Sequence, residues 1–264
     1  MLLALASLAA AADPSFAGAD AAGQKFEKPE SHLAAELGGA FTSGNTQTYT
    51  LNASIDGDHR WKRNKLGVDA GANLGRSILD TSGDGHIDDT ERALGWAETA
   101  RKVWLDARYD RYVGARDSLY LLGGTLIDPF AGYDNRSHVQ VGYSRILVET
   151  KRTVLVTEIG VDGAREDFVA GIEPNEQYLV AARVMAGLTH QFNDNVAFSD
   201  KVEVYENVPA FADVRVLNQA SLTSKLSDKF SLKLSHHLTF DNQPVEGFQP
   251  LDQTATVTFV ASIL

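Results

Sequence analysis

Residues 230–240 read Phe-Ser-Leu-Lys-Leu-Ser-His-His-Leu-Thr-Phe, and apolar side chains alternate with polar ones along this stretch. Successive side chains of a β-strand point to opposite faces, so the stretch predicts a strand with one apolar and one polar surface. Only His236 interrupts the apolar series. The pattern recurs about twelve times between Leu33 and Ile263, in segments of roughly ten residues, so it governs the whole chain.

The length of these segments favours a membrane barrel. A tilted strand of about 9–11 residues crosses a bilayer, whereas strands of soluble sheets have about 5–6 residues. We therefore predict an all-β fold, a twelve-stranded antiparallel transmembrane β-barrel, and an even strand number is typical of such barrels. The strands are expected at 32–43, 46–57, 64–77, 97–113, 117–127, 136–149, 153–166, 177–191, 195–206, 214–226, 230–241 and 253–263.

The connections between the predicted strands are sorted by length. After the second strand, short connections (58–63, 114–116, 150–152, 192–194 and 227–229) alternate with longer ones (78–96, 128–135, 167–176, 207–213 and 242–252). Short periplasmic turns and longer outer loops are typical of outer-membrane barrels. A tight turn at Gly44-Asn45 is the exception on the loop side. The alternation predicts that both termini lie in the periplasm of a Gram-negative bacterium.

Composition excludes several classes of protein. No run approaches the ~18 apolar residues of a membrane helix, and alternating strands keep the mean hydropathy of a barrel near neutral. The formal net charge of −11 argues against a nucleic-acid partner, because phosphate binding requires a basic surface. The absence of Cys fits an oxidising compartment.

The first residues resemble an export signal. An apolar core runs from Leu2 to Ala12 and ends in small residues, as at a signal-peptidase site, although a basic segment before it is missing. A short buried helix is the alternative. We expect a signal peptide at 1–12, a flexible periplasmic leader at 13–31 and the barrel at 32–264.

The polar phase of the strands is expected to face the lumen, because a charge facing lipid costs about 2–4 kcal/mol at the bilayer midplane. Charges of both signs on this phase could pair inside a narrow lumen. The predicted lumen residues are Glu36, Asn52, Asp69, Asn73, Asp106, Arg108, Asp110, Glu158, Asp162, Arg183, Glu203, Lys225, Lys233 and His237. Trp61 and Trp96 lie near strand ends, where an aromatic girdle would be expected.

Several short motifs carry a family resemblance. They are Glu36-Leu37-Gly38, the run 42–46 (Thr-Ser-Gly-Asn-Thr), the run 107–112 (Ala-Arg-Tyr-Asp-Arg-Tyr), the run 128–134 with Arg136, Gly142-Tyr143, the run 226–232 and the run 241–244. In this order and spacing, the chain from Leu33 onward resembles the salt-induced outer-membrane protein family, a bacterial family with no established biochemical function. The resemblance implies an outer-membrane barrel and no catalytic residues. The chain departs from the family at Leu264, where an aromatic assembly signal is usual.

Residues 80–91 match the twelve-residue calcium loop of EF-hand proteins. Oxygen-bearing side chains fall at its first, third, fifth, ninth and last positions, and Gly85 stands at the sixth, where the chain must turn sharply. The predicted Ca²⁺ ligands are Asp80, Ser82, Asp84, Asp88 and Glu91, with His86 contributing its backbone carbonyl. No flanking helices are predicted, and an acidic surface loop is the alternative. We expect a structural Ca²⁺ ion in the longest outer loop, near lipopolysaccharide.

Catalysis has little support in the sequence. Ser235 and His237 share a strand face but stand about 7 Å apart along it, which is not the paired geometry of a nucleophile and its base. The leading functional hypothesis is a narrow passive channel for ions or small solutes. A structural or osmotic-stress barrel with a plugged lumen is the alternative, and a lipid-acting enzyme is the third. The expected partners are outer-membrane lipid, lipopolysaccharide and the barrel-assembly machinery.

Overall fold

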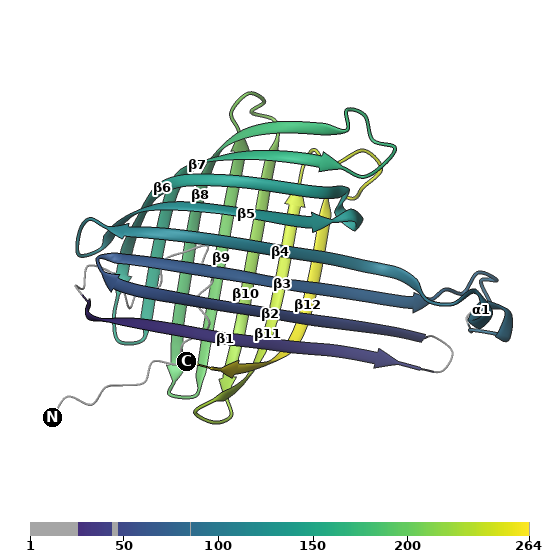
Figure 1. The fold of residues 1–264 in the computed structure, drawn as a ribbon, viewed down its shortest axis with the longest axis horizontal. Coiled ribbons are helices and arrows are strands. Elements are labelled where there is room, and N and C mark those ends of the chain that lie inside the picture. The colour runs from purple at the N-terminus through teal and green to yellow at the C-terminus, as the bar shows by residue number, and fades with distance from the viewer. Residues whose placement is uncertain (1–25, 44–46, 85, 264) are drawn as a thin grey trace.

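Twelve antiparallel strands form one closed barrel in a computed structural model that describes residues 26–43, 47–84 and 86–263 (Figure 1). Each strand pairs with its neighbours in sequence, and β1 also pairs with β12. The elements are β1 (Phe26–Thr42), β2 (Gln47–Lys62), β3 (Asn64–Ile78), α1 (Asp89–Leu94), β4 (Ala97–Tyr112), β5 (Asp117–Asp128), the 3₁₀ helix η2 (Pro129–Ala131), β6 (Tyr133–Glu149), β7 (Thr153–Phe168), β8 (Glu176–Asn193), β9 (Val196–Asn207), β10 (Val214–Lys225), β11 (Phe230–Asp241) and β12 (Leu251–Ser262). The predicted fold class is confirmed.

The alternating pattern decides which face of each strand points outward. The apolar phase covers the outside of the barrel, where Leu37 is 60% and Phe41 69% exposed. The polar phase turns inward, and buried charged residues such as Arg108 and Glu158 lie inside the barrel. The fold therefore has apolar side chains outside and polar side chains inside, the reverse of a soluble protein, as a lipid-facing barrel requires. Among the residues that the structure describes, no helix is long and apolar enough to cross a membrane.

Two aromatic clusters mark the two ends of the apolar belt. Towards the loops, the Tyr49 and Trp96 rings lie 5.2 Å apart between centroids. Towards the turns, Trp61 lies 5.4 Å from the His59 ring and 6.3 Å from the Tyr109 ring. Such rings are enriched at membrane interfaces, so these clusters bracket the membrane-spanning part of the wall.

The strand ends at the first turn differ from those predicted. Strand β1 begins at Phe26 rather than near 32, and β2 continues to Lys62 rather than ending near 57. The predicted turn at 58–63 was wrong, because the turn is shortened to Lys62, with φ of 50°, and Arg63, between the paired residues Trp61 and Asn64. Polar residues here continue the strand because Asp58 and Arg60 both point inward and form a buried ion pair at 2.7 Å.

Two predicted loops also contain helical turns. The connection expected at 128–135 shortens to 129–132, because the Asp128 carboxylate accepts a hydrogen bond from the Ala131 N–H and caps η2. The loop at 79–96 contains α1, where no helix was predicted. The predicted signal peptide at 1–12 lies outside the described residues, as does most of the leader at 13–31, whose residues 26–31 belong to β1.

Candidate functional site

A central cavity of about 830 Å³ occupies the barrel lumen. It extends from the turn side, where Thr150 and Asp194 line it, to Arg136 near the loop end of β6. Nine of the predicted lumen residues line this cavity: Glu36, Asn52, Asp69, Asn73, Asp106, Asp162, Glu203, Lys233 and His237. The sequence pattern therefore brings these side chains together around one space.

The two sides of the lumen differ in chemistry. Strands β10 to β12 contribute small hydroxyl side chains, including Ser221, Ser235, Thr254, Thr256 and Thr258. These short side chains leave the space beside them unfilled. The opposite wall, from β4 to β9, carries large charged side chains that pack against one another. The cavity thus runs between a hydroxyl-rich wall and a charged wall.

Four of the other predicted lumen residues form a buried charge cluster on the charged wall rather than lining the cavity. The Arg108 guanidinium contacts Asp110 at 2.8 Å and Glu158 at 2.7 Å. Arg183 contacts the other Glu158 oxygen at 2.8 Å and Glu203 at 2.6 Å. The carboxylate of Glu158 therefore lies between two guanidinium groups. Burial of so many charges is tolerated only because each has charged hydrogen-bond partners.

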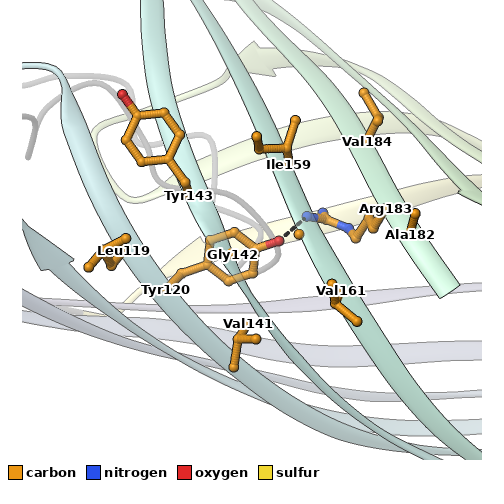
Figure 2. A pocket seen from close by; sticks show the side chains of 11 residues that line it. Leu119, Tyr120, Val141, Gly142, Tyr143, Ile159, Val161, Ala182, Arg183 and Val184 are labelled. Carbon is orange, nitrogen blue, oxygen red and sulfur yellow. Dashed lines mark hydrogen bonds between the residues drawn. The ribbon is translucent and has the colours of Figure 1, made fainter. Parts of the chain in front are cut away.

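The cluster extends through residues that the sequence analysis did not select. Lys201 contacts Glu203 at 2.9 Å, and the Tyr205 hydroxyl donates to the same carboxylate at 2.9 Å. The Arg183 guanidinium donates to the Tyr120 hydroxyl at 2.8 Å (Figure 2). Arg108 lies 4.2 Å from the Tyr120 ring centroid. Each of these residues is in the inward phase of its strand, so the alternation was the signal that could have identified them.

Two inward-facing glycines make room for Tyr120. Gly142 and Gly160 are opposite each other on β6 and β7, and a Cβ on either would lie 2.5 Å from the Tyr120 hydroxyl. The Tyr120 ring therefore lies flat against the wall beside Gly142, as Figure 2 shows. On the lipid side of the same glycines, a shallow apolar hollow is lined by side chains such as Leu119, Val141 and Ile159.

A histidine joins two lumen carboxylates at mid-height of the lumen. His138 Nε2 lies 3.2 Å from Asp106 Oδ1, and His138 Nδ1 lies 3.2 Å from Asp162 Oδ1. Both carboxylates were predicted to line the lumen, but the sequence analysis did not select the histidine that bridges them. Gln140 packs beside the ring, with its amide nitrogen 3.2 Å from Nδ1.

A second charge cluster lies at the loop end of the lumen, and the sequence analysis missed it. Glu166 contacts Arg136 at 3.3 Å and also accepts from Arg215. Arg215 in turn contacts Asp241 at 2.8 Å. The last predicted lumen residue, Lys225, lies at the other end, where it pairs with Asp228 of the β10–β11 turn at 2.8 Å.

The chain matches one described protein family along most of its length. Residues 35–263 match the family "Protein of unknown function, DUF481". The chain belongs to this family. No curated protein sequence is significantly similar to it. The similarity of the chain to the salt-induced outer-membrane protein family stays a resemblance.

Solved structures share the barrel fold of this DUF481 protein at low sequence identity. The NanC porin aligns with a TM-score of 0.53 and 13% identity, over 88% of this chain and 100% of that chain. An outer membrane channel from Pseudomonas putida F1 aligns with a TM-score of 0.46 and 10% identity, over 94% of this chain and 100% of that chain. The likeness to NanC shows that the DUF481 chain has the fold of an outer-membrane barrel.

The predicted calcium loop of the DUF481 barrel lies at the tip of the β3–β4 connection, beyond the outer girdle. Its last predicted ligand, Glu91, is only 2% exposed, and its Oε1 accepts from the Thr81 and Ser82 N–H groups at 2.6 and 2.9 Å. Its Oε2 accepts from the Asp88 N–H, and Asp88 caps α1 in return. Backbone donors from Ser82, Asp88 and Thr81 hold the pKa of Glu91 below its usual range.

The other predicted ligands are satisfied within the same loop. Asp80 Oδ1 accepts from the Ser82 hydroxyl at 3.0 Å, and Asp84 Oδ1 accepts from the His86 N–H at 3.1 Å. Across the described part of the chain, no three His, Cys, Asp or Glu side chains are grouped to hold a metal ion. In this arrangement the Glu91 carboxylate accepts hydrogen bonds from backbone N–H groups, whereas the motif predicts that it binds a metal ion. Ca²⁺ binding therefore stays a prediction.

Proposed function

We propose that this protein is a passive channel for ions or small polar solutes in the outer membrane of a Gram-negative bacterium. The observation that carries the proposal is the polar cavity that runs from the turns at the β6–β7 end to Arg136 near the loop end of the lumen. Hydroxyl side chains along β10 to β12 give a permeating solute exchangeable hydrogen bonds in place of water. The exposed apolar belt between two aromatic clusters supports a location in a membrane.

Single-channel recording of refolded protein in a planar bilayer tests the proposal. We expect discrete openings whose conductance falls when Ser235, a cavity-lining residue, is replaced by Trp. The matched control is Leu234→Trp, because Leu234 is the next residue on the same strand and points outward. Openings in the Leu234→Trp variant should equal those of the native protein. A correctly folded protein that gives no openings, or openings that both variants reduce equally, would contradict the channel.

A structural barrel with a plugged lumen is the second candidate. The buried cluster around Arg108, Glu158 and Arg183 favours it, because this cluster fills one side of the lumen with paired charges. A silent but folded protein in the recording experiment would favour this candidate. A lipid-acting enzyme is the third hypothesis, and it would require a lipase activity that Ser235→Ala abolishes. Contacts with lipopolysaccharide and insertion by the barrel-assembly machinery belong to the proposal in either case.

A further inference from the structure

The seam that closes the barrel is paired over only a short length. Strands β1 and β12 form four register pairs, from Ala34↔Ser262 to Leu37↔Phe259. By contrast, β1 and β2 are paired from Phe26 to Thr42. At Gly38 the two seam strands are still adjacent, because a Cβ there would lie 2.5 Å from the Val257 carbonyl oxygen. Beyond Gly38, no described residue of β1 pairs with β12.

Both faces of the wall are exposed beyond this point. Ala40 and Thr254 belong to the inward phase, yet they are as open to their surroundings as Phe41 and Leu251 of the outward phase. On β7, across the barrel from the seam, the inward residue Glu166 at the loop end is buried. In Figure 1, β12 bends away from β1 on the loop side of their short contact. The wall is therefore open between residues 39–42 and 251–256.

This opening lies in the outer half of the membrane-spanning belt. Phe41 pairs with Tyr49, and Tyr49 contacts Trp96 in the outer aromatic cluster. The opening therefore starts at the outer interface and reaches inward to Gly38. Strand edges that face hydrocarbon leave N–H and C=O groups without partners, which is tolerated only where a polar cavity or a polar ligand satisfies them.

The opening connects with the lumen. Thr254, Thr256 and Thr258 on β12 and Glu36 on β1 all line the central cavity. On the outer side, the edges of the opening carry the exposed apolar residues Phe41 on β1 and Leu251 on β12. One end of the opening thus offers hydroxyl groups and free strand edges, and the other offers an apolar surface in contact with lipid.

We propose that the β1–β12 opening is a lateral passage for single-chain amphiphiles between the lumen and the outer leaflet. A polar head with hydroxyl or amide groups would hydrogen-bond to the threonine ladder (Thr254, Thr256 and Thr258) and to the free strand edges. The apolar chain would lie between the outer edges of the opening. A second copy of the protein fits less well, because residues 39–42 of the β1 edge would bury far less than the ~1,000 Å² of a stable interface. The inference rests on the lumen being a solute path.

Paired cysteines test whether the opening exists in the membrane, since the native chain contains no Cys. Continuing the register of the four pairs would place Ala40 opposite Thr256. Ala40 is opposite Thr50 on its other side, so A40C/T50C is a matched control, and A34C/S262C is a control within the paired part of the seam. We expect disulfides in both controls, detected by mass spectrometry of protein in vesicles, and at least tenfold fewer in A40C/T256C. Equal oxidation of A40C/T256C and A34C/S262C would overturn the proposal.

Fluorescence quenching tests the occupant. A brominated dodecyl-chain amphiphile added to vesicles should quench the indole introduced by Thr254→Trp several-fold more than the one introduced by Ser221→Trp, because Ser221 lies on the lumen wall of β10 away from the seam. Enforced oxidation of A40C/T256C in the Thr254→Trp background should remove this difference. An intermolecular disulfide in the single variant Thr254→Cys would instead indicate pairing between copies and would overturn the proposal.

The two proposals fail in different ways. Ionic conductance together with no quenching of the Thr254→Trp variant would leave the channel standing and reject the lateral passage. Quenching without conductance would reject the passive channel and leave an amphiphile-binding seam, contradicting a passage that depends on the lumen. Conductance that persists after the seam is locked by the disulfide, together with lost quenching, is the result expected if both hold.

Discussion

Replacement of Arg183 by Met should destabilise the barrel strongly, because the guanidinium holds the buried charge cluster together. The change removes contacts to Glu158 at 2.8 Å and Glu203 at 2.6 Å and a hydrogen bond to Tyr120 at 2.8 Å. Met has similar length, so the loss is chiefly electrostatic rather than a cavity. Two carboxylates then lose one of their cationic partners while remaining inside the barrel.

The expected magnitude follows from the partners that remain. Removal of one member of a buried ion pair costs about 3–5 kcal/mol. Glu158 keeps its contact with Arg108, and Glu203 keeps its contact with Lys201, so the lower end of that range applies. A loss of about 3 kcal/mol in the free energy of unfolding corresponds to roughly a hundredfold change in the unfolding equilibrium. Urea unfolding of protein refolded into short-chain lipid vesicles measures this change.

Arg165→Met is the matched control. Arg165 also contacts two carboxylates, Asp167 and Glu176, both at 2.8 Å, and it also lies over a tyrosine ring, at 5.9 Å compared with 5.7 Å for Arg183. It differs in being half-exposed at the loop end of β7, where water screens its charge. We expect the urea midpoint of this variant to match that of the native protein. Equal destabilisation by the two substitutions would refute the argument that burial makes the cluster important.

Three further predictions follow from local geometry. Gly142→Ala should cost about 1–3 kcal/mol, because the new Cβ would lie 2.5 Å from both the Tyr120 hydroxyl and the Ile159 carbonyl oxygen. Gly163→Ala should be nearly neutral in the same urea assay, since its Cβ would meet only a carbonyl oxygen at 3.9 Å. The folded-state pKa of Glu91 is depressed, so its ionised carboxylate orders the loop at neutral pH, and this order is lost as the pH falls through that pKa. Amide hydrogen exchange of the loop measures the loss, and Glu91→Gln should produce the same faster exchange at pH 7. The calcium motif predicts Tb³⁺ luminescence that Ca²⁺ competes away and that Asp80→Asn weakens, and absence of Tb³⁺ binding by the native protein would reject the motif.

The two-residue alternation was sufficient to predict the strands and the faces of the barrel. A one-residue shift would place every charge of a strand in lipid, so the phase of a barrel strand is strongly determined. Residues such as Arg108, Asp110 and Glu158 were therefore assigned to the correct side of the wall. Their pairing was not predictable, because Arg108 and Glu158 lie on strands three apart, and their distance depends on the curvature and tilt of the closed barrel.

Local composition misled the prediction where polar residues continue a strand. The run from Asp58 to Arg63 has the composition of a turn, yet two of its members pair inside the lumen and only Lys62 and Arg63 turn the chain. The helix α1 was missed because its stability comes from reciprocal capping by Asp88 and Glu91, and both residues had been assigned to Ca²⁺. The incomplete seam between β1 and β12 leaves no trace in either strand's own alternation.

The buried cluster also determines which part of the barrel wall can deform. It links β4, β7, β8 and β9 through charged contacts, so this sector behaves as a stiff plate whose strands cannot separate without exposing unpaired charges. Strands β10 and β11 are joined to β7 through Arg215, Glu166 and Asp241 near the loop end, whereas β12 ends at a seam with four register pairs. Thermal breathing of the barrel is therefore concentrated at the β12 seam, and any widening of the lumen occurs by movement of the seam strand against the braced sector.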